Sequence, residues 1–344
     1  MQCKTVVLIE NVPSGAPGPE HFRIEETTVS PPSVDGDVLV QVLVMSADPY
    51  LRGGIKAGPG NKKPGDAMTG FVAGKVLESR NANWKAGDLF GASLPFATVQ
   101  LLNPEILSKT VIWNLTSFID EAHISYGVGV LGMPGSTAYG GLIDVLKPNA
   151  GETIFVSAAA GAVGGLVGQI AKNVYGLKTI GSAGGAAKCE LVKSKFGFDA
   201  AIDYKSVSSA DELGAKLASA APGGIDMYFE NVGGMHLEAA FANLRVKGRI
   251  ALCGMISQYN DAIPELNKLL LMKMIYGQQR IEGFMCMPWL SGQQGHFLAD
   301  MSGWLKEGKL QVEETFFDGI EQWPVAFQSL FTGANTGKVV VRVA

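Results

Sequence analysis

The pattern of apolar and polar positions changes near the middle of the chain. Up to about Val130, apolar runs at residues 38–44 (VLVQVLV) and 71–78 (FVAGKVLE) predict strands, and Gly87-Asp88 predicts a turn between runs. Strands separated by turns at short spacing predict a compact, barrel-like β domain.

Beyond Thr153 the pattern alternates between short apolar runs and helical spacing. Strands are predicted at residues 153–157, 178–181, 200–203, 225–230 and 249–253. Helices are predicted between them at residues 165–175, 186–196, 209–218 and 235–244. Such alternation indicates a parallel sheet with helices on both faces, and therefore the α/β class with a doubly wound, Rossmann-type sheet. A final strand at residues 339–343 is expected to return to the first domain.

Composition excludes several classes of protein. The chain has 344 residues, of which 47% are hydrophobic and 17% charged, so two domains with sizeable cores are expected. The net charge is −4 and no run is rich in Lys and Arg, so a nucleic-acid partner is not expected. No apolar run is long enough to predict a membrane span, and no signal peptide is evident, so a cytoplasmic location is expected by default.

Metal-binding residues are scattered through the sequence. Neither the four cysteines nor the four histidines form a local cluster: Cys3, Cys189, Cys253, Cys286, His21, His123, His236 and His296. Reduced thiols are therefore expected rather than a disulfide framework or a structural zinc site. A catalytic zinc site, which needs such ligands close together, is disfavoured and no metal is predicted.

The strongest local motif follows the strand predicted at residues 153–157. Ala159-x-Gly161-x-x-Gly164 lies directly after that strand and directly before a helix. Small residues there let the backbone approach a pyrophosphate, and the helix N-terminus supplies N–H groups and partial positive charge. The loop Gly161, Ala162, Val163 and Gly164 is therefore predicted to bind a dinucleotide.

The second strand of the parallel sheet indicates which dinucleotide is bound. NAD enzymes place Asp or Glu near its end for the ribose hydroxyls. The sequence at residues 179–188 (TIGSAGGAAK) has no acid, but has Ser182 and Lys188, which would attract a 2′-phosphate. NADP is therefore favoured, although Lys188 as an ordinary solvated helix lysine stays open.

Two tyrosines are candidates to polarise a substrate oxygen in the absence of zinc. Tyr50 lies where a predicted strand ends in a loop, and Tyr259 lies just beyond the carboxyl end of a predicted parallel strand. Ligands of open α/β sheets bind at that edge, so the Tyr259 phenol could donate to a carbonyl oxygen that becomes an enolate. A role of either tyrosine in packing or on the surface stays open.

Many spaced strings, in order along nearly the whole chain, resemble one family. The chain is similar to the zinc-free medium-chain dehydrogenase/reductases, in the group of leukotriene hydroxydehydrogenases, prostaglandin reductases and plant alkenal double-bond reductases. The matching strings are 45–52 (MSADPYLR), 132–140 (GMPGSTAYG), 156–164 (VSAAAGAVG), 168–172 (GQIAK), 181–184 (GSAG), 226–234 (DMYFENVGG), 254–260 (GMISQYN) and 333–338 (GANTGK).

The resemblance implies an architecture and a reaction. It implies a GroES-like catalytic domain from residues 1–130 and 301–344, with a Rossmann NADPH-binding domain at residues 131–300. It also implies a homodimer and NADPH-dependent reduction of the carbon–carbon double bond of an α,β-unsaturated ketone or aldehyde. An NADPH quinone reductase, a non-catalytic NADPH-binding protein and a zinc alcohol dehydrogenase remain as alternatives.

The resemblance also implies roles for particular residues. Lys188 and Tyr204 would hold the 2′-phosphate, and Asn231 and Asn335 would contact the cofactor. Tyr259 would assist the enolate and Tyr50 would line the substrate pocket. The same resemblance places Arg280 in a loop that borders cofactor and substrate. The segments 61–68 and 285–289 depart from the family's usual pocket residues, which leaves the substrate open.

Overall fold

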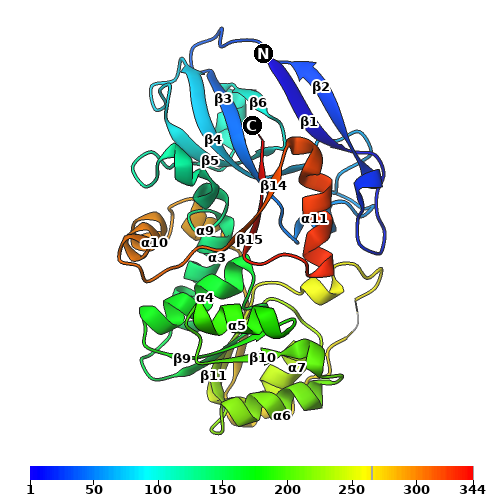
Figure 1. Ribbon diagram of the computed structural model, residues 1–344, viewed down its shortest axis with the longest axis vertical. Helices are drawn as coiled ribbons and strands as arrows, with labels where there is room; N and C mark the ends of the chain where they lie inside the picture. Colours follow the sequence, from blue (N-terminus) through cyan, green and yellow to red (C-terminus); the bar gives the residue numbers. More distant parts are fainter. Residues whose placement is uncertain (265, 344) are drawn as a thin grey trace. The chain divides into compact units, whose positions relative to one another are not determined.

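The computed structural model describes residues 1–264 and 266–343. The chain divides into two compact units (Figure 1). The first unit comprises Met1–Met133, Leu290–Gln294 and Glu314–Ala344, and the second comprises Pro134–Trp289 and Gly295–Glu313. The assignment of residues 1–130 and 301–344 to a catalytic domain stays a prediction. No helix among the described residues is long and apolar enough to cross a membrane.

The second unit contains a sheet of six parallel strands in the order β10-β9-β8-β11-β12-β13. The strands are β8 (Thr153–Val156), β9 (Lys178–Ala183), β10 (Ala200–Asp203), β11 (Ile225–Glu230), β12 (Leu244–Leu252) and β13 (Arg280–Gly283). This order is that of a doubly wound sheet, whose ligands bind outside the carboxyl ends of the strands where the order reverses. The reversal lies between β8 and β11. The predicted α/β class is confirmed.

Helices lie on both sides of this sheet (Figure 1). The helices whose residues fall mainly in the second unit are α3 (Met133–Gly140), the π-helical η3 (Gly141–Leu146), α4 (Ala162–Asn173), α5 (Ala186–Ser194), η4 (Tyr204–Ser206), α6 (Ala210–Ala220), α7 (Met235–Ala242), η5 (Ile256–Gln258), α8 (Met272–Gly277), α9 (Met287–Leu290) and α10 (Phe297–Lys306). In the core, the rings of Phe155 and Tyr228 stack with centroids 5.1 Å apart, and Leu213 and Leu217 of α6 are fully buried.

The boundary predicted between the fourth helix and the fifth strand is wrong. A helix was expected to reach Leu244, but α7 ends at Ala242 and Leu244 begins β12. The N–H of Asn243 donates to the carbonyls of Ala239 and Ala240 and closes the helix. Leu244 is buried and pairs with Ile225 of β11, so the apolar run continues across the boundary and hides it.

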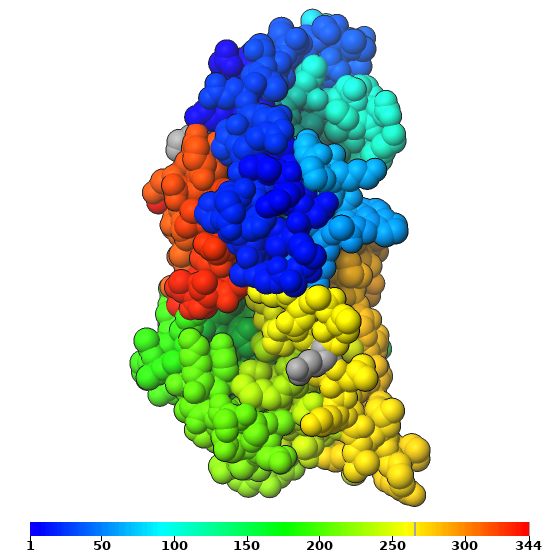
Figure 2. Space-filling model, turned by 90° about the vertical axis from the view of Figure 1, so that its right-hand side faces the viewer, coloured from blue at the N-terminus to red at the C-terminus, as the bar shows by residue number. Residues whose placement is uncertain are grey.

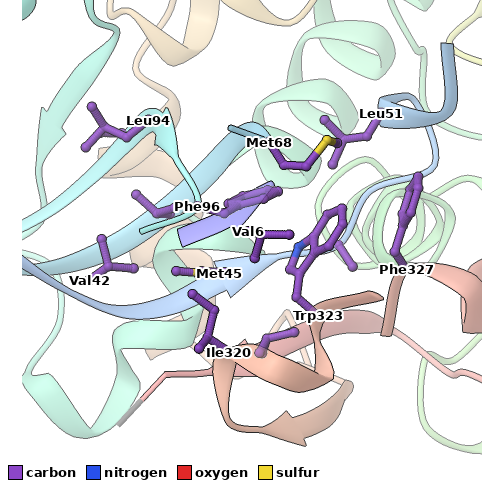
Figure 3. Packing of buried hydrophobic residues seen from close by; sticks show 14 of the residues in the cluster. Val6, Val42, Met45, Leu51, Met68, Leu94, Phe96, Ile320, Trp323 and Phe327 are labelled. Atoms are coloured by element: carbon purple, nitrogen blue, oxygen red, sulfur yellow. The ribbon is translucent and has the colours of Figure 1, made fainter. Parts of the chain in front are cut away.

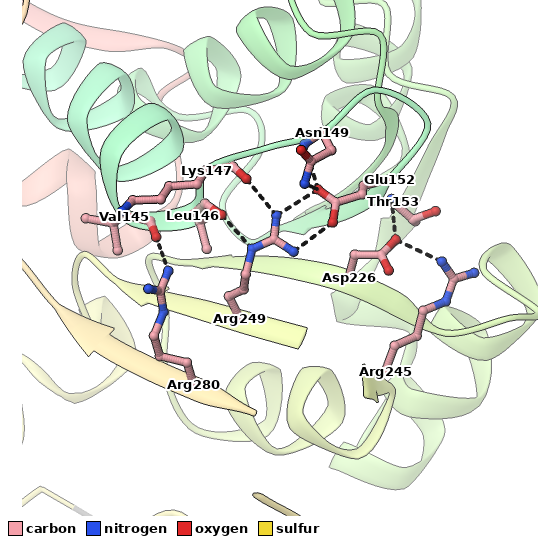
Figure 4. Close-up of polar contacts among 10 residues, drawn as sticks. All are labelled: Val145, Leu146, Lys147, Asn149, Glu152, Thr153, Asp226, Arg245, Arg249 and Arg280. Carbon is pink, nitrogen blue, oxygen red and sulfur yellow. Dashed lines mark hydrogen bonds and ion pairs between the residues drawn. The ribbon is translucent and has the colours of Figure 1, made fainter. Parts of the chain in front are cut away.

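Arginine side chains of β12 connect this strand to residues at the start of β8 and β11 (Figure 4). Arg249 of β12 makes two hydrogen bonds to the Glu152 carboxylate, at 2.8 and 2.7 Å, and also donates to the carbonyls of Leu146 and Lys147. Arg245 donates to Asp226, which accepts the Thr153 N–H as well. Paired guanidinium–carboxylate bonds of this kind are among the stronger polar contacts, and they fix β8, β11 and β12 at this end.

The first unit contains a mainly antiparallel sheet in the order β14-β15-β3-β4-β5-β7, with β6 paired to β3, and a separate β1–β2 pair. The strands are β1 (Gln2–Leu8), β2 (Phe22–Thr28), β3 (Val38–Ser46), β4 (Thr69–Ser79), β5 (Leu89–Pro95), β6 (Val99–Leu102), β7 (Ile112–Asn114), β14 (Glu314–Asp318) and β15 (Lys338–Arg342). Its helices are η1 (Pro19–His21), α1 (Leu51–Gly54), α2 (Pro104–Lys109), η2 (Glu121–Val128), η6 (Ile320–Gln322) and α11 (Trp323–Thr332). β15 pairs antiparallel with β3, so the last strand returns to the first unit as predicted.

The core of the first unit gathers around Trp323 of α11 (Figure 3). The Trp323 ring is fully buried and lies 4.9 Å from the ring of Phe96 and 5.1 Å from that of Phe327. Its indole N–H donates to the carbonyl of Ser46 at the end of β3, at 3.0 Å. The hydrogen bond satisfies the polar end of a large apolar side chain, as buried tryptophans require.

A buried ion pair joins β15 to the loop after β3. The Lys338 ammonium is 2.8 Å from the Asp48 carboxylate and also donates to the Ala47 carbonyl. Both side chains are only 4% exposed. Burial lowers the pKa of Lys338, and the Asp48 carboxylate opposes that shift.

Replacing Lys338 with methionine should destabilise the protein by about 3–5 kcal/mol, because the Asp48 carboxylate would stay buried without its partner. Chemical denaturation of both proteins measures the difference. Lys4→Met, which removes the exposed pair with Glu321, is the matched control and should change stability little. Equal stability of the native chain and Lys338→Met would contradict a structural role for the pair.

Candidate cofactor site

The glycine-rich turn after β8 leads directly into α4. Gly161 is the N-cap of α4, and no side chain caps this helix end. A methyl group on Gly164 would lie 2.4 Å from the Ala158 carbonyl oxygen, so only glycine fits there without moving the backbone. The first N–H groups of a helix lack intrahelical partners and attract anions. The turn is therefore suited to a pyrophosphate.

A buried polar network connects this turn to the end of β11, across the point where the strand order reverses. The Asn231 side-chain amide donates to the Ser157 carbonyl at 2.7 Å, and the Asn231 N–H donates to the Ser157 hydroxyl at 2.9 Å. The Tyr228 hydroxyl donates to the Glu230 carboxylate at 2.7 Å. The predicted cofactor residue Asn231 is thus brought next to the glycine-rich turn.

Glu230 is the centre of this network. Its Oε1 accepts hydrogen bonds from the N–H groups of Val232 and Gly233, at 2.6 and 2.9 Å, as well as from Tyr228 and Ser157. Burial raises the pKa of the Glu230 carboxyl, against the effect of these donors. The side chain has no exposed surface, so it holds the loop after β11 in place rather than touching a ligand. No motif in the sequence points to Glu230.

The end of β9 gathers two lysines and a phenol. A methyl group on Gly184 would lie 2.9 Å from the Tyr204 hydroxyl oxygen and 3.0 Å from Cε of Lys205. Burial lowers the pKa of Lys188 in α5, and the neighbouring Lys205 charge lowers it further. Lys188 and Tyr204 are therefore brought to the same place, together with Lys205, to which no motif in the sequence points.

The Tyr204 ring packs against a buried histidine. The rings of Tyr204 and His236 meet edge to face with centroids 5.1 Å apart. Burial lowers the pKa of His236 to about 4, so its imidazole is neutral at neutral pH. This contact fixes the Tyr204 phenol beside Gly184.

Tyr259 lies in the turn that follows β12. Its hydroxyl oxygen accepts a hydrogen bond from the Met255 N–H at 3.2 Å, and a methyl group on Gly254 would lie 2.8 Å from that oxygen. The turn is attached to the loop after β11, because the Ile256 N–H donates to the Asn231 carbonyl at 3.2 Å. Tyr259 and Asn231 thus lie at the same edge of the sheet.

Two residues predicted to contact the cofactor are not brought to this edge in the same way. Ser182 lies in β9 with no exposed surface, so this arrangement gives a phosphate no access to its hydroxyl. Arg280 begins β13 and its guanidinium donates to the carbonyl of Val145, at the amino-terminal part of the sheet (Figure 4). The roles expected of Ser182 and Arg280 stay predictions.

The other two predicted residues belong to the first unit. Tyr50 precedes α1, is 45% exposed and lies with its ring 6.4 Å from that of Phe71. Asn335 lies in the loop between α11 and β15, where the Thr336 N–H donates to the Thr315 hydroxyl at 3.1 Å. Their roles in substrate and cofactor binding also stay predictions.

The residues at the edge of the second unit fit a dinucleotide that carries a 2′-phosphate. The glycine-rich turn leaves room for a pyrophosphate at a helix N-terminus, and two ammonium groups lie one strand away, at the end of β9. Among residues 1–264 and 266–343, no group of three or more His, Cys, Asp and Glu side chains is placed to hold a metal ion. A reaction without zinc stays a prediction.

The strand order and the glycine-rich turn define the class of Rossmann-type dinucleotide-binding proteins. A family model described as the N-terminal domain of oxidoreductase matches residues 4–110, and one described as zinc-binding dehydrogenase matches residues 162–295. The chain is 39% identical to prostaglandin reductase 1 of Mus musculus over 328 residues, which cover 95% of each chain. It belongs to the medium-chain dehydrogenase/reductase family, in the group of prostaglandin and alkenal reductases.

Two further comparisons extend this result. The chain is 38% identical over 345 residues to 2-alkenal reductase (NADP(+)-dependent) of Nicotiana tabacum, covering 98% of this chain and 97% of that one. Its structure matches that of CurA in complex with NADPH from Vibrio vulnificus with a TM-score of 0.84, 35% identity and 99% coverage of each chain. The resemblance predicted from the sequence strings is thus confirmed.

Proposed function

We propose that the protein is an NADPH-dependent reductase of the carbon–carbon double bond of α,β-unsaturated ketones and aldehydes. The observation that carries this proposal is the phenol of Tyr259 at the carboxyl edge of a dinucleotide-binding sheet, in a turn that is hydrogen-bonded to the loop after β11. Near-full-length similarity to an enzyme named 2-alkenal reductase supports the reaction, and the NADPH complex of CurA supports the cofactor.

Bound at the glycine-rich turn, NADPH would supply a hydride to the β-carbon of the substrate, and a proton that comes from water would complete the saturated product at the α-carbon. Negative charge then develops on the carbonyl oxygen of the substrate, where a hydrogen-bond donor stabilises it. Burial raises the pKa of the Tyr259 hydroxyl, so the phenol keeps its proton at neutral pH and acts as a donor. The Met255 N–H donates a hydrogen bond to the phenol oxygen and so helps to fix its position. Tyr50 is proposed to line the substrate pocket.

The test is NADPH oxidation, followed by absorbance, with an enal, an enone, a quinone, a saturated aldehyde or no acceptor, each with and without a metal chelator. We expect oxidation with enal or enone, a saturated carbonyl product and no effect of the chelator. Oxidation with the quinone alone would replace this proposal with a quinone reductase. Binding of NADPH without oxidation by any acceptor would favour a non-catalytic protein, and loss of activity on chelation would overturn a metal-free reaction.

We infer a cytoplasmic location for this enzyme. All four cysteines are free thiols, which suits a reducing compartment. Fractionation of cells that produce the full chain tests the inference, and recovery in a secreted or membrane fraction would contradict it.

We also propose that the protein is a homodimer, assembled at the β13 edge of the second unit. β13 ends the sheet and pairs only with β12 in the part of the chain that the structure describes. Beside it, large apolar side chains of residues 59–77% exposed form what we call the edge patch: Leu270, Leu271, Met272, Ile275 and Tyr276. Figure 2 shows the segment before and within α8, in yellow, on the molecular surface.

A second copy of the chain is the occupant that fits this surface. A groove of about 460 Å³ lies in the edge patch and is lined by Leu244, Val246, Leu270, Met272, Lys273, Tyr276, Gly277 and Gln279. An open strand edge beside an apolar surface is self-complementary across a two-fold axis, because the same strand can pair antiparallel with its copy. The proposal therefore predicts a continuous sheet through both copies.

Replacing Ile275 with glutamate should dissociate the dimer, since it places a charge in the edge patch. Sedimentation velocity should give a dimer of the 36.3 kDa native chain and a monomer of the variant. Ile106→Glu, at an exposed site in the first unit, should remain dimeric. A monomeric native chain, or a dimeric Ile275→Glu protein, would overturn this interface.

A further inference from the structure

The segment that follows β3 carries positive charge without acids. Between Asp48 and Asp66 the chain has no Asp or Glu. It has four cations there: Arg52, Lys56, Lys62 and Lys63. The Asp48 carboxylate is already paired with the buried Lys338 ammonium. The segment therefore favours anions, and the side chain of one of its lysines is placed by contacts within the first unit.

The backbone of Lys62 is attached to the helix that begins after Tyr50. The Lys62 N–H donates to the carbonyl of Gly54, the last residue of α1, at 2.8 Å. The Lys62 carbonyl accepts a hydrogen bond from the Asn11 side-chain amide at 2.7 Å. Tyr50 is the N-cap residue of the same helix, which is only four residues long. Lys62 and Tyr50 are therefore fixed near the two ends of one helical turn.

The side chain of Lys62 extends to the start of β4. Its ammonium donates to the Thr69 hydroxyl at 2.8 Å. Burial lowers the pKa of Lys62, and the charge of Asp66 opposes this shift. The Asp66 carboxylate accepts the Lys63 N–H at 2.8 Å, and among the described residues no acid forms an ion pair with Lys62. Because an ammonium has three donors, donors remain for an anionic ligand.

This ammonium lies on the same face of β4 as the ring of Tyr50. Alternate side chains of a strand point the same way, so Thr69 and Phe71 share a face. Gly70 between them faces the core, since a methyl group on it would lie 2.5 Å from the buried Phe96 ring. The ring of Tyr50 lies 6.4 Å from that of Phe71. The ammonium and the Tyr50 ring thus contact neighbouring positions on that face, about 7 Å apart along the strand.

We propose that Lys62 is a specificity-determining residue that binds a carboxylate at the far end of the substrate. The preferred substrates are then α,β-unsaturated ketones or aldehydes whose chain ends in an acid. This inference rests on the proposed function and on the place of Tyr50 in the substrate pocket. Hydrogen bonds from an ammonium to a carboxylate are stronger than those to a neutral oxygen. The Tyr50 and Phe71 rings beside the ammonium suit the apolar chain that joins the two ends of such a substrate.

The test compares substrates that differ only in this charge. Steady-state kinetics is measured with 8-oxo-9-undecenoic acid and the shorter 6-oxo-7-nonenoic acid, each beside its methyl ester. We expect the native full chain to favour at least one acid over its ester in kcat/KM. Lys62→Met should lower this preference about ten-fold, through KM for the acid, as follows removal of one charge-assisted hydrogen bond. Lys62→Arg keeps the charge and should retain most of the preference.

Lys63→Met is the matched control. It removes the next cation of the same segment, whose side chain is exposed, and should keep the native preference for the acid. Isothermal titration calorimetry with the same acids and esters gives a second readout that does not depend on turnover. Circular dichroism checks that the variants fold.

Each outcome decides between the inference and the function on which it rests. Equal use of acid and ester by the native chain would overturn the role of Lys62, and so would an undiminished preference in Lys62→Met. A higher KM for NADPH in place of the acid would also overturn it, since the cation would then serve the phosphates of the cofactor. Binding of an acid that depends on Lys62, without reduction of any enone by the native chain, would instead overturn the proposed reaction.

Discussion

Replacing Gly164 with alanine will weaken NADPH binding by about 10- to 100-fold, the loss that follows removal of a hydrogen bond to a charged group at the helix N-terminus. The added methyl group would lie 2.4 Å from the Ala158 carbonyl oxygen and 3.0 Å from that of Ser157. Neither oxygen can retreat easily. Ala158 already has a left-handed backbone with φ of 50°, and the Ser157 carbonyl is held by the Asn231 amide. The N-terminus of α4 must therefore move away from the pyrophosphate.

Fluorescence titration of NADPH measures this loss, and Gly303→Ala is its control. Gly303 lies within α10, where an added methyl group meets no atom within 4 Å. This substitution should leave binding unchanged and stabilise the helix slightly. Native affinity for NADPH in Gly164→Ala would mean that the turn after β8 does not bind the cofactor.

Replacing Tyr259 with phenylalanine will lower kcat for enone reduction by about 10- to 100-fold, less than a full oxyanion-hole donor contributes, because the enolate is a delocalised anion. Affinity for NADPH should not change, since the phenol is proposed to act on the substrate oxygen. Because the pKa of the hydroxyl is raised, the native enzyme should not lose rate through this group between pH 7 and its ordinary pKa of 10.0. Steady-state kinetics with NADPH titrations separates the two effects.

Tyr175 provides the matched control for this substitution. It is half-buried in the same unit but follows α4, at the end of the helix away from the glycine-rich turn. Tyr175→Phe should keep the native kcat. Native turnover in Tyr259→Phe would remove the phenol from the mechanism, whereas loss of NADPH affinity would point to a distorted turn after β12.

The parallel sheet was predictable because each of its first strands is a short apolar run followed by small residues and helical spacing. The region at Met133–Leu146 was not, because α3 is buried along Pro134–Gly140 and so has no polar face to reveal its period. Its glycines disfavour a helix in isolation but allow close packing, since a methyl group on Gly140 would lie 2.3 Å from the Trp289 ring. Tertiary contacts decide this segment.

Part of the candidate site was predictable from the sequence, and part was not. Lys188 was predicted from its place after the second strand, and Tyr204 and Asn231 came from the family resemblance. The structure brings these residues to the carboxyl edge of the sheet. Lys205 and Glu230 were missed because their positions depend on contacts between distant parts of the chain: Lys205 extends over Gly184, and Glu230 reaches Ser157 across the sheet. No local spacing in the sequence encodes such contacts.

The place of β15 has a consequence for the order in which the chain folds during synthesis. This strand, near the end of the sequence, lies between β14 and β3, whereas every strand of the second unit is complete by Gly283. At about 5–20 residues per second, β3 would emerge from the ribosome many seconds before its partner. During that interval β6 can cover β3 along Val38–Gln41, but the end of β3 at Val44–Ser46 stays open beside an incomplete apolar core. The parallel sheet of the second unit can therefore form before the sheet of the first unit, which is complete only when Lys338–Arg342 is made.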